Sequence, residues 1–214
     1  MSQNPRLVLT ERFTEAVEYA RQLHTEYRKG TGIPYLTHLL GVAALVMGEA
    51  DGRVPVTEDM VIAALLHDAV EDHGGMPRLH EIEGRFGAEV SRMVAALSDT
   101  FAEDHDKKEG WEDRKNNYLA RLRGEPDDVL LISAADKLYN AKAILDDFKE
   151  IGPAVFARFK RGAKEQLWYF DELLKVFRTH PPNRIVNDLE RVVQELRAET
   201  SNKAYISRSG SLVP

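Results

Sequence analysis

The stretch LLHDAVED at residues 65–72 changes from apolar residues to side chains that can bind a metal, and it organises the whole chain. Apolar or small residues lead directly into one histidine and three carboxylates. A charge beside such a buried run is costly unless it is paired or bound to a metal. On a helix, His67 and Glu71 share one edge, and Asp68 and Asp72 share the neighbouring edge. The stretch therefore predicts an imidazole and carboxylates gathered around one point.

Two distant residues would complete a metal site with this stretch. His38 lies in a second predicted helix, and Asp136 emerges from a long helix that is apolar nearly all round. With His67 and Asp68 they form a nitrogen and oxygen donor set that suits Mn²⁺, with Fe²⁺, Co²⁺ or Mg²⁺ as alternatives. Such an ion activates water and polarises a phosphoryl oxygen, while the acids one turn beyond carry a proton and position the water. Those acids are Glu71 and Asp72.

Bulk composition limits the classes of function. The chain has 214 residues, of which 43% are hydrophobic, enough for one domain with a real core. Its net charge of -6 argues against binding to nucleic acid or to a membrane surface, because both require a basic face. The absence of cysteine excludes disulfides, zinc–thiolate sites and a cysteine nucleophile. Because no apolar run suits a signal peptide or a membrane span, we expect a soluble, cytoplasmic protein.

Apolar residues recur at helical spacing through most of the chain, and no alternating strand pattern competes with them. The pattern predicts an all-α fold, a bundle of helices. Charged residues without an apolar period predict a loop or lid over 101–113. The expected helices cover 10–29, 34–47, 57–73, 77–86, 87–99, a segment ending near 123, 129–150, a segment beginning at 152–153 and a segment after 181–182.

These helices predict one domain with a short extension. We expect the domain to cover residues 1–180, a C-terminal helix at 181–200 to pack on it, and a flexible tail to occupy 201–214. The aromatic residues after 152–153 are typical of a core or a dimer face, so a homodimer stays open.

The order of the candidate ligands resembles a known family signature. His38, then His67-Asp68, then Asp136 resemble the H…HD…D pattern of the HD metal-dependent phosphohydrolases, over roughly residues 10–175. Longer motifs look like the hydrolase domain of SpoT/RelA-type alarmone enzymes, which remove the 3′-pyrophosphate of (p)ppGpp. These motifs are Arg28-Lys29-x4-Pro34-Tyr35-x2-His38, His67-Asp68-x2-Glu71-Asp72 and Asp136-Lys137-Leu138-x-Asn140.

The resemblance implies an HD-type helical bundle that acts as a metal-dependent (p)ppGpp-like 3′-pyrophosphohydrolase on a small nucleotide substrate. The implied ligands of one Mn²⁺ ion are His38, His67, Asp68 and Asp136. The implied catalytic pair is Glu71 and Asp72. The residues implied to bind substrate are Arg28, Lys29, Tyr35, Lys137 and Asn140. Basic residues near the metal, with Arg114 and Lys115 as further candidates, would hold phosphate oxygens.

The chain also departs from the alarmone enzymes. His73 stands where those enzymes usually have threonine after the Glu-Asp pair. The charged residues at 101–113 replace an Asp-Gly-Val-x-Lys-like segment that plausibly borders the base pocket. We expect no synthetase domain in the residues after about 180. We place His73 beside the site and give no role to His24, His80 or His180. A centre with two metals would need further histidines between the His-Asp pair and Asp136, where only His73, His80 and His105 are available, so a single metal is favoured.

Each candidate residue also has a plainer interpretation. His38 could be a surface histidine, Asp136 a buried carboxylate paired with a base, and Asn140 an amide that packs a helix. Lys137 could point away from the site. The joint pattern outweighs these readings. Two other functions stay open: a nucleotidase or phosphatase for another phosphorylated small molecule, and a non-catalytic nucleotide sensor.

Overall fold

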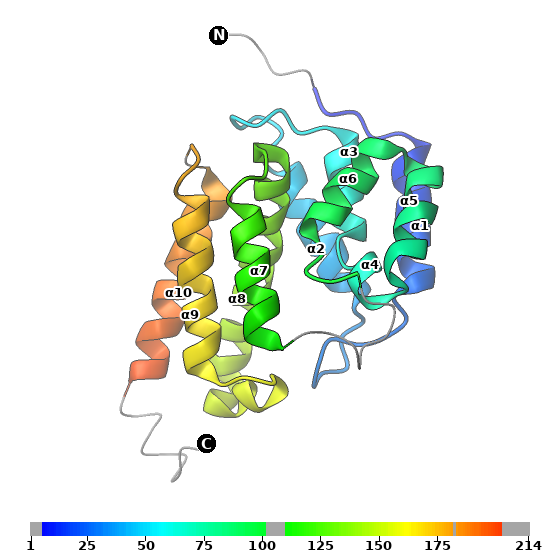
Figure 1. Cartoon of the computed structure of the whole chain (residues 1–214). Helices are drawn as coiled ribbons and strands as arrows, with labels where there is room; N and C mark the ends of the chain where they lie inside the picture. Colours follow the sequence, from blue (N-terminus) through cyan, green and yellow to red (C-terminus); the bar gives the residue numbers. More distant parts are fainter. Residues whose placement is uncertain (1–5, 102–109, 182, 203–214) are drawn as a thin grey trace. The chain divides into compact units, whose positions relative to one another are not determined.

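The computed structural model describes residues 6–101, 110–181 and 183–202, and these residues fold almost entirely as helices (Figure 1). The described part contains no strand, only one isolated bridge between Tyr27 and Pro34. The all-α prediction is therefore confirmed. The chain divides into two compact units, Met1–Asp136 and Lys137–Pro214.

The first unit holds seven complete helices among its described residues, and the start of an eighth. They are α1 (Glu11–Leu23), α2 (Leu36–Met47), α3 (Glu58–Leu66), α4 (Ala69–Asp72), α5 (Gly75–Phe86), α6 (Ala88–Leu97), α7 (Trp111–Leu122) and α8 (Asp127–Ile151), which continues into the second unit.

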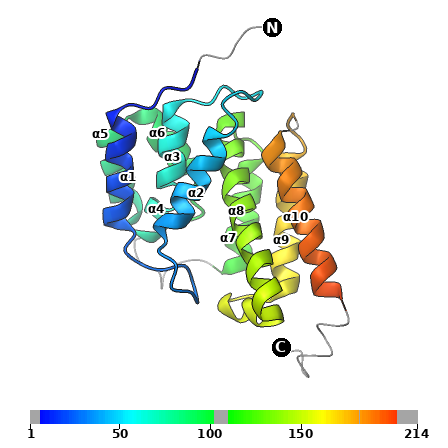
Figure 2. The ribbon, with the colours of Figure 1, turned by 180° about the vertical axis from the view of Figure 1, so that it is seen from behind.

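Helix α3 is the centre of the first unit. Every residue from Met60 to Leu66 is buried, and α3 packs against α1, α2 and α6 (Figure 2). Each fully buried leucine or isoleucine here contributes about 1.5–3 kcal/mol by leaving water. The hydroxyl of Thr57 accepts a hydrogen bond from the Met60 amide (3.3 Å), so the helix begins at its predicted residue.

The expected helix over 57–73 is wrong in one respect, because it is interrupted at His67 and Asp68. Helix α3 ends at Leu66 and α4 begins at Ala69. The ring Nδ1 of His67 lies 2.8 Å from the carbonyl oxygen of Ala64. Carbonyl groups in the last turn of a helix have no amide partner further along that helix. At the end of α3, the His67 ring takes the place of such an amide. His67 (φ −59°, ψ −32°) and Asp68 (φ −92°, ψ −8°) both keep right-handed helical angles, so the interruption is a local one.

The expected helix over 10–29 is also too long, since α1 ends at Leu23. Beyond it the chain folds back on itself: the Arg28 amide donates to the Ile33 carbonyl (2.7 Å), and the Tyr35 amide donates to the Glu26 carbonyl (2.9 Å). Gly30, with φ of 72°, occupies the left-handed region that this turn requires. The turn places Glu26 beside Tyr35 at the start of α2.

The second unit contains the remainder of α8, a 3₁₀ segment η2 (Gly152–Arg158), α9 (Ala163–Phe177) and α10 (Arg184–Ser201). The single aromatic helix expected from 152–153 is therefore divided, because Gly152 and Pro153 begin a 3₁₀ turn and α9 starts later. Helices α9 and α10 lie side by side (Figure 2), and Arg197 on α10 pairs with Asp171 on α9 at 2.6 Å.

Several aromatic side chains of this unit are core residues. Tyr169, Phe170 and Phe177 are buried in α9, and Phe156 is buried in η2. That burial supports the core reading of the aromatic stripe, while the dimer stays a prediction. The expected domain limits also stay predictions.

No helix in the described ranges is both long and apolar enough to span a membrane. The helix expected to end near 123 is confirmed by α7. Residues 102–109 of the expected loop, and the expected tail from 203 onward, lie outside the described residues.

Candidate metal centre

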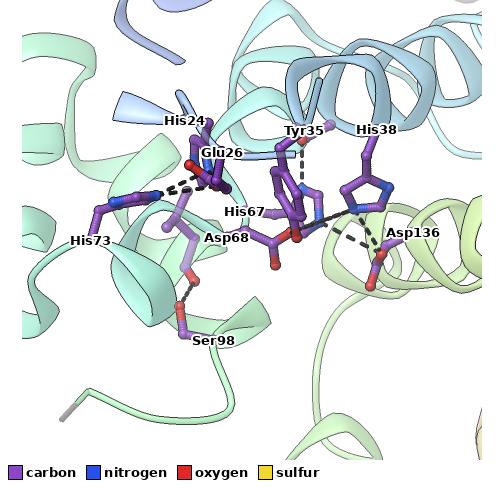
Figure 3. A network of polar contacts seen from close by, with 11 residues as sticks. His24, Glu26, Tyr35, His38, His67, Asp68, His73, Ser98 and Asp136 are labelled. Carbon is purple, nitrogen blue, oxygen red and sulfur yellow. Dashed lines mark hydrogen bonds and ion pairs between the residues drawn. The ribbon is translucent and has the colours of Figure 1, made fainter. Parts of the chain in front are cut away.

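Three predicted residues of the first unit, His38, His67 and Asp68, bring one polar atom each to a common point, and Asp136 approaches the two imidazoles (Figure 3). The two imidazoles face each other, with His38 Nε2 3.2 Å from His67 Nε2. Asp68 Oδ2 lies 3.4 Å from His38 Nε2 and 3.1 Å from His67 Nε2. Asp136 Oδ1 lies 3.3 Å and 3.6 Å from the same two nitrogens. We call these four residues the HD cluster.

The dimensions of the HD cluster suit a divalent cation. Two ligand atoms that each lie about 2.1 Å from one ion are about 3.0–3.4 Å apart at octahedral or tetrahedral angles. The nitrogen–nitrogen and nitrogen–oxygen separations here, 3.1–3.6 Å, fall close to that range. Two imidazoles and two carboxylates also form a donor set that metals of the Mn²⁺ to Zn²⁺ series accept. The residues present therefore fit a metal ion.

Local structure fixes how the His67 ring is presented. Its Nδ1 lies within hydrogen-bond distance of the Ala64 carbonyl oxygen (2.8 Å), which can only accept, so Nδ1 carries the proton and donates. In the neutral ring, Nε2 then keeps its lone pair toward the other members of the HD cluster. A backbone or carboxylate partner of this kind usually orients metal-binding histidines.

The charges of the HD cluster balance one another. Burial alone would lower the pKa of His67, but Asp68 and Asp136 outweigh burial and hold that pKa well above its usual range. Burial would raise the pKa of Asp68, yet the imidazoles of His67 and His38 hold it well below the usual value. The Asp68 carboxylate therefore stays ionised, and its negative charge favours positive charge at this point, as protons or as a cation.

Tyr35, predicted to bind substrate, contacts the HD cluster directly. Its hydroxyl donates a 2.6 Å hydrogen bond to Asp68 Oδ2, and its ring lies against His38. Burial, followed by the charge of Asp68, raises the pKa of Tyr35 far above its ordinary value. The hydroxyl therefore stays protonated and acts as a donor that orients the carboxylate.

The predicted catalytic acids lie at the end of α4, one turn beyond the HD cluster. Glu71 is half-buried, with a side chain that is 24% exposed, and its Oε1 lies 3.4 Å from Arg114 Nη1. Burial and the neighbouring charge of Asp99 raise the pKa of Glu71 to about 7. A carboxyl with that pKa can both give and take a proton near neutral pH. Asp72 is also half-buried, and its charge contributes to the raised pKa of Tyr35.

Asp99 is a site residue that the sequence did not reveal. Its side chain is 3% exposed. It accepts hydrogen bonds from Arg114 Nη1 at 2.8 and 2.9 Å and from Lys115 Nζ at 2.7 Å. These two basic residues, expected to hold phosphate, are thus engaged by a buried carboxylate. Asp99 follows an ordinary helical stripe and directly precedes the loop, so no spacing pattern distinguished it from a surface acid.

Fewer contacts define the positions of the other predicted substrate residues. The Arg28 guanidinium lies over the Tyr35 ring, 5.8 Å from its centroid, and Lys29 is exposed. Lys137 and Asn140 belong to the second unit, so their substrate roles stay predictions.

Two residues without a predicted ligand role gather close to the HD cluster. His24, for which no function was predicted, is buried and stacks on Tyr35 with ring centroids 5.2 Å apart. His73 contacts His24 edge to face at 4.4 Å. Their proximity depends on the early end of α1, which periodicity did not predict.

Comparisons with known proteins agree with this geometry. A family model described as "HD domain" matches residues 16–163. The mouse protein named guanosine-3′,5′-bis(diphosphate) 3′-pyrophosphohydrolase MESH1 is 35% identical over 131 residues, which are 60% of this chain and 66% of the mouse protein. The Aquifex aeolicus protein named guanosine-3′,5′-bis(diphosphate) 3′-pyrophosphohydrolase is 31% identical over 134 residues, 63% of this chain and 18% of that protein.

A solved structure adds evidence on the fold. The structure of a metazoan ortholog of SpoT that hydrolyses ppGpp superposes with a TM-score of 0.68, covering 88% of this chain and 97% of that chain at 24% identity. This likeness shows the fold alone. HD domains are metal-dependent, and the described His and Asp groups could bind a metal. Since the family model matches well over half of the sequence and the H…HD…D residues meet in space, the chain belongs to the HD-domain family.

Proposed function

We propose that this protein is a metal-dependent hydrolase that removes the 3′-pyrophosphate of a ppGpp-like nucleotide. The observation that carries the proposal is the convergence of His38, His67, Asp68 and Asp136 on one point in a chain whose relatives are named for this reaction. The cytoplasmic location and the homodimer stay predictions.

We propose that the four residues of the HD cluster hold one divalent ion, with Mn²⁺ as the expected metal. When bound, such an ion supplies Lewis acidity, which lowers the pKa of water and polarises a phosphoryl oxygen. Tyr35 supports this role because its hydroxyl fixes the orientation of Asp68. Outer partners of this kind commonly change metal affinity by about 10–100-fold.

Glu71 is the proposed proton carrier. Hydrolysis of the 3′-ester bond places a hydroxyl group from water on the departing pyrophosphate and returns a proton to the 3′-oxygen of the nucleotide. A carboxyl whose pKa is about 7 can accept the proton from water and deliver it to the leaving oxygen. Asp72 is the proposed group that positions the water, and its place beside Glu71 at the end of α4 supports that role.

Basic residues near the site are proposed to bind the phosphate groups. Arg28 lies over the ring of Tyr35, and the hydroxyl of Tyr35 donates a hydrogen bond to Asp68 of the HD cluster. Lys29, Lys137 and Asn140 are proposed as further contacts to the nucleotide.

Incubation of the Mn²⁺-loaded protein with ppGpp tests the proposal. We expect GDP and pyrophosphate in equal amounts, and no product from GDP, which lacks the 3′-diphosphate. Asp136→Asn should lose metal and activity together, whereas Glu71→Gln should keep the metal and lose turnover. Release of single phosphate, or no release at all, would remove the 3′-pyrophosphohydrolase assignment.

A further inference from the structure

A second histidine and carboxylate cluster lies beside the HD cluster in the first unit (Figure 3). His24 Nδ1 lies 2.8 Å from Glu26 Oε1, and His73 Nε2 lies 3.2 Å from His24 Nδ1 and 3.4 Å from Glu26 Oε1. The three atoms therefore form a small triangle, which we call the His24 cluster. Its members come from the end of α1, the turn after it and the residue after α4.

Protons satisfy this triangle only in part. If both ring nitrogens carry protons, both N–H groups can donate to Glu26 Oε1, but the 3.2 Å contact between the two nitrogens then holds no hydrogen bond. If only His24 Nδ1 is protonated, the lone pair of His73 Nε2 faces the carboxylate at 3.4 Å. In the neutral rings at least one of the three contacts is therefore without a hydrogen bond, because each nitrogen either donates or accepts. A single cation among the three atoms would make all the contacts favourable.

We propose that His24, Glu26 and His73 form a second divalent metal site, distinct from the HD cluster. Two imidazoles and one carboxylate are the donor set of catalytic zinc sites and suit Zn²⁺, or Co²⁺ as its probe, with water completing the coordination. The separations of 2.8–3.4 Å are close to those between ligands that share one such ion.

The surroundings hold the ligands in place. The His24 side chain is fully buried, stacked on Tyr35 and packed edge to face against His73. The backbone at His73 is held by Arg78, whose Nε donates to the His73 carbonyl at 2.8 Å. Glu26 and His73 remain partly accessible, with side chains 40% and 27% exposed, so an ion can reach the triangle from solvent.

One detail predicts that the second site is the weaker one. Metal binding through His24 Nδ1 leaves the ring proton on Nε2, which is buried and has no hydrogen-bond partner among the described residues. The HD cluster offers four donor groups instead of three, and its His67 ring is fixed because its second nitrogen faces the Ala64 carbonyl. We therefore expect the HD cluster to fill first and the His24 cluster to fill at higher Zn²⁺ concentration.

An ion at the His24 cluster would join two segments that matter for the HD cluster. Glu26 lies two residues before Arg28, and His73 directly follows Asp72. The Tyr35 ring contacts both His24 and His38. The second ion would thus position the proposed nucleotide-binding turn against the proposed catalytic acids.

Zn²⁺ binding to the full-length, chelator-treated protein tests this inference. Equilibrium dialysis followed by metal analysis should find two ions per chain in the wild type. His73→Ala and Glu26→Gln should each lose the weaker ion, or weaken it by more than about tenfold, and keep the stronger one. His80→Ala, which removes an exposed histidine of α5, is the matched control and should still bind two ions.

A further variant separates this inference from the proposed function. Asp68→Asn removes a residue of the HD cluster, and we expect it to keep the ion of the His24 cluster whether or not ppGpp is hydrolysed. Unchanged helical circular dichroism would confirm that each variant is folded. One ion in the wild type, or two ions in both His73→Ala and Glu26→Gln, would overturn the second site.

Discussion

Replacing Glu71 by glutamine tests the electrostatics of the acid beside the HD cluster. Burial and the charge of Asp99 raise the pKa of Glu71 from 4.5 to about 7. The folded protein therefore binds this proton more tightly than the unfolded chain does. The resulting stabilisation is fully present below the unfolded pKa of 4.5, and it is lost as the pH rises through about 7. Glutamine resembles the protonated acid at every pH, so Glu71→Gln should abolish this dependence.

The magnitude follows from the two pKa values. A shift of about 2.5 units is equivalent to about 3.4 kcal/mol, since each unit corresponds to about 1.4 kcal/mol. By linkage, wild type has lost about 1.4 kcal/mol of this stabilisation at about pH 5.5 and about 3.4 kcal/mol at about pH 8.5. The stability of Glu71→Gln relative to wild type should therefore rise by about 2 kcal/mol between these pH values.

Urea unfolding of chelator-treated protein at several pH values measures this difference. Glu83→Gln, which changes an exposed glutamate of α5, is the matched control and should follow wild type throughout. If Glu71→Gln and wild type change in parallel from about pH 5.5 to about pH 8.5, Glu71 is not the raised acid, and the proton-carrier role loses its basis.

Three further predictions concern the same unit. Asp99→Asn leaves Arg114 and Lys115 facing a neutral side chain, so the free energy of unfolding should fall by about 3 kcal/mol in urea titrations, and equal stability would contradict this. Tyr35→Phe keeps the ring but removes the 2.6 Å hydrogen bond to Asp68, so titration should show roughly tenfold weaker Mn²⁺ binding. Ile62→Ala should cost about 2–5 kcal/mol in the same unfolding assay because the side chain is fully buried in α3, and a loss under about 1 kcal/mol would refute its core position.

Much of the fold follows from local sequence. The apolar period of α6 and α10 marked their buried faces, the unbroken apolar run of α3 marked a helix buried on all sides, and Thr57 marked the start of α3 through its side-chain cap. Such signals are readable because a cap or an amphipathic face depends on residues within a few positions of one another. The C-terminal ends of α1 and α3 could not be predicted from such local signals. Their limits depend on contacts made by the His67 ring and by the turn after Leu23.

The HD cluster was predictable as a set of residues, because two histidines and two aspartates stand out against apolar helices and match an ordered signature. Its supporting contacts were not. Asp99 is separated from Glu71 by two helices and gains its influence from burial beside Arg114 and Lys115. Burial and neighbouring charge set a pKa, and neither is a property of the local sequence.

The amino-acid sequence by itself determined the helical class, the position of the central apolar helix and the four side chains suited to a metal. Tertiary structure alone decided which polar atoms face one another: the placement of His38 and Asp136 against His67 and Asp68, the Asp99 partner of Glu71, and the meeting of His24, Glu26 and His73. The physical reason is that helix formation depends on neighbours along the chain, whereas ligand geometry and acidity depend on groups that only folding brings together.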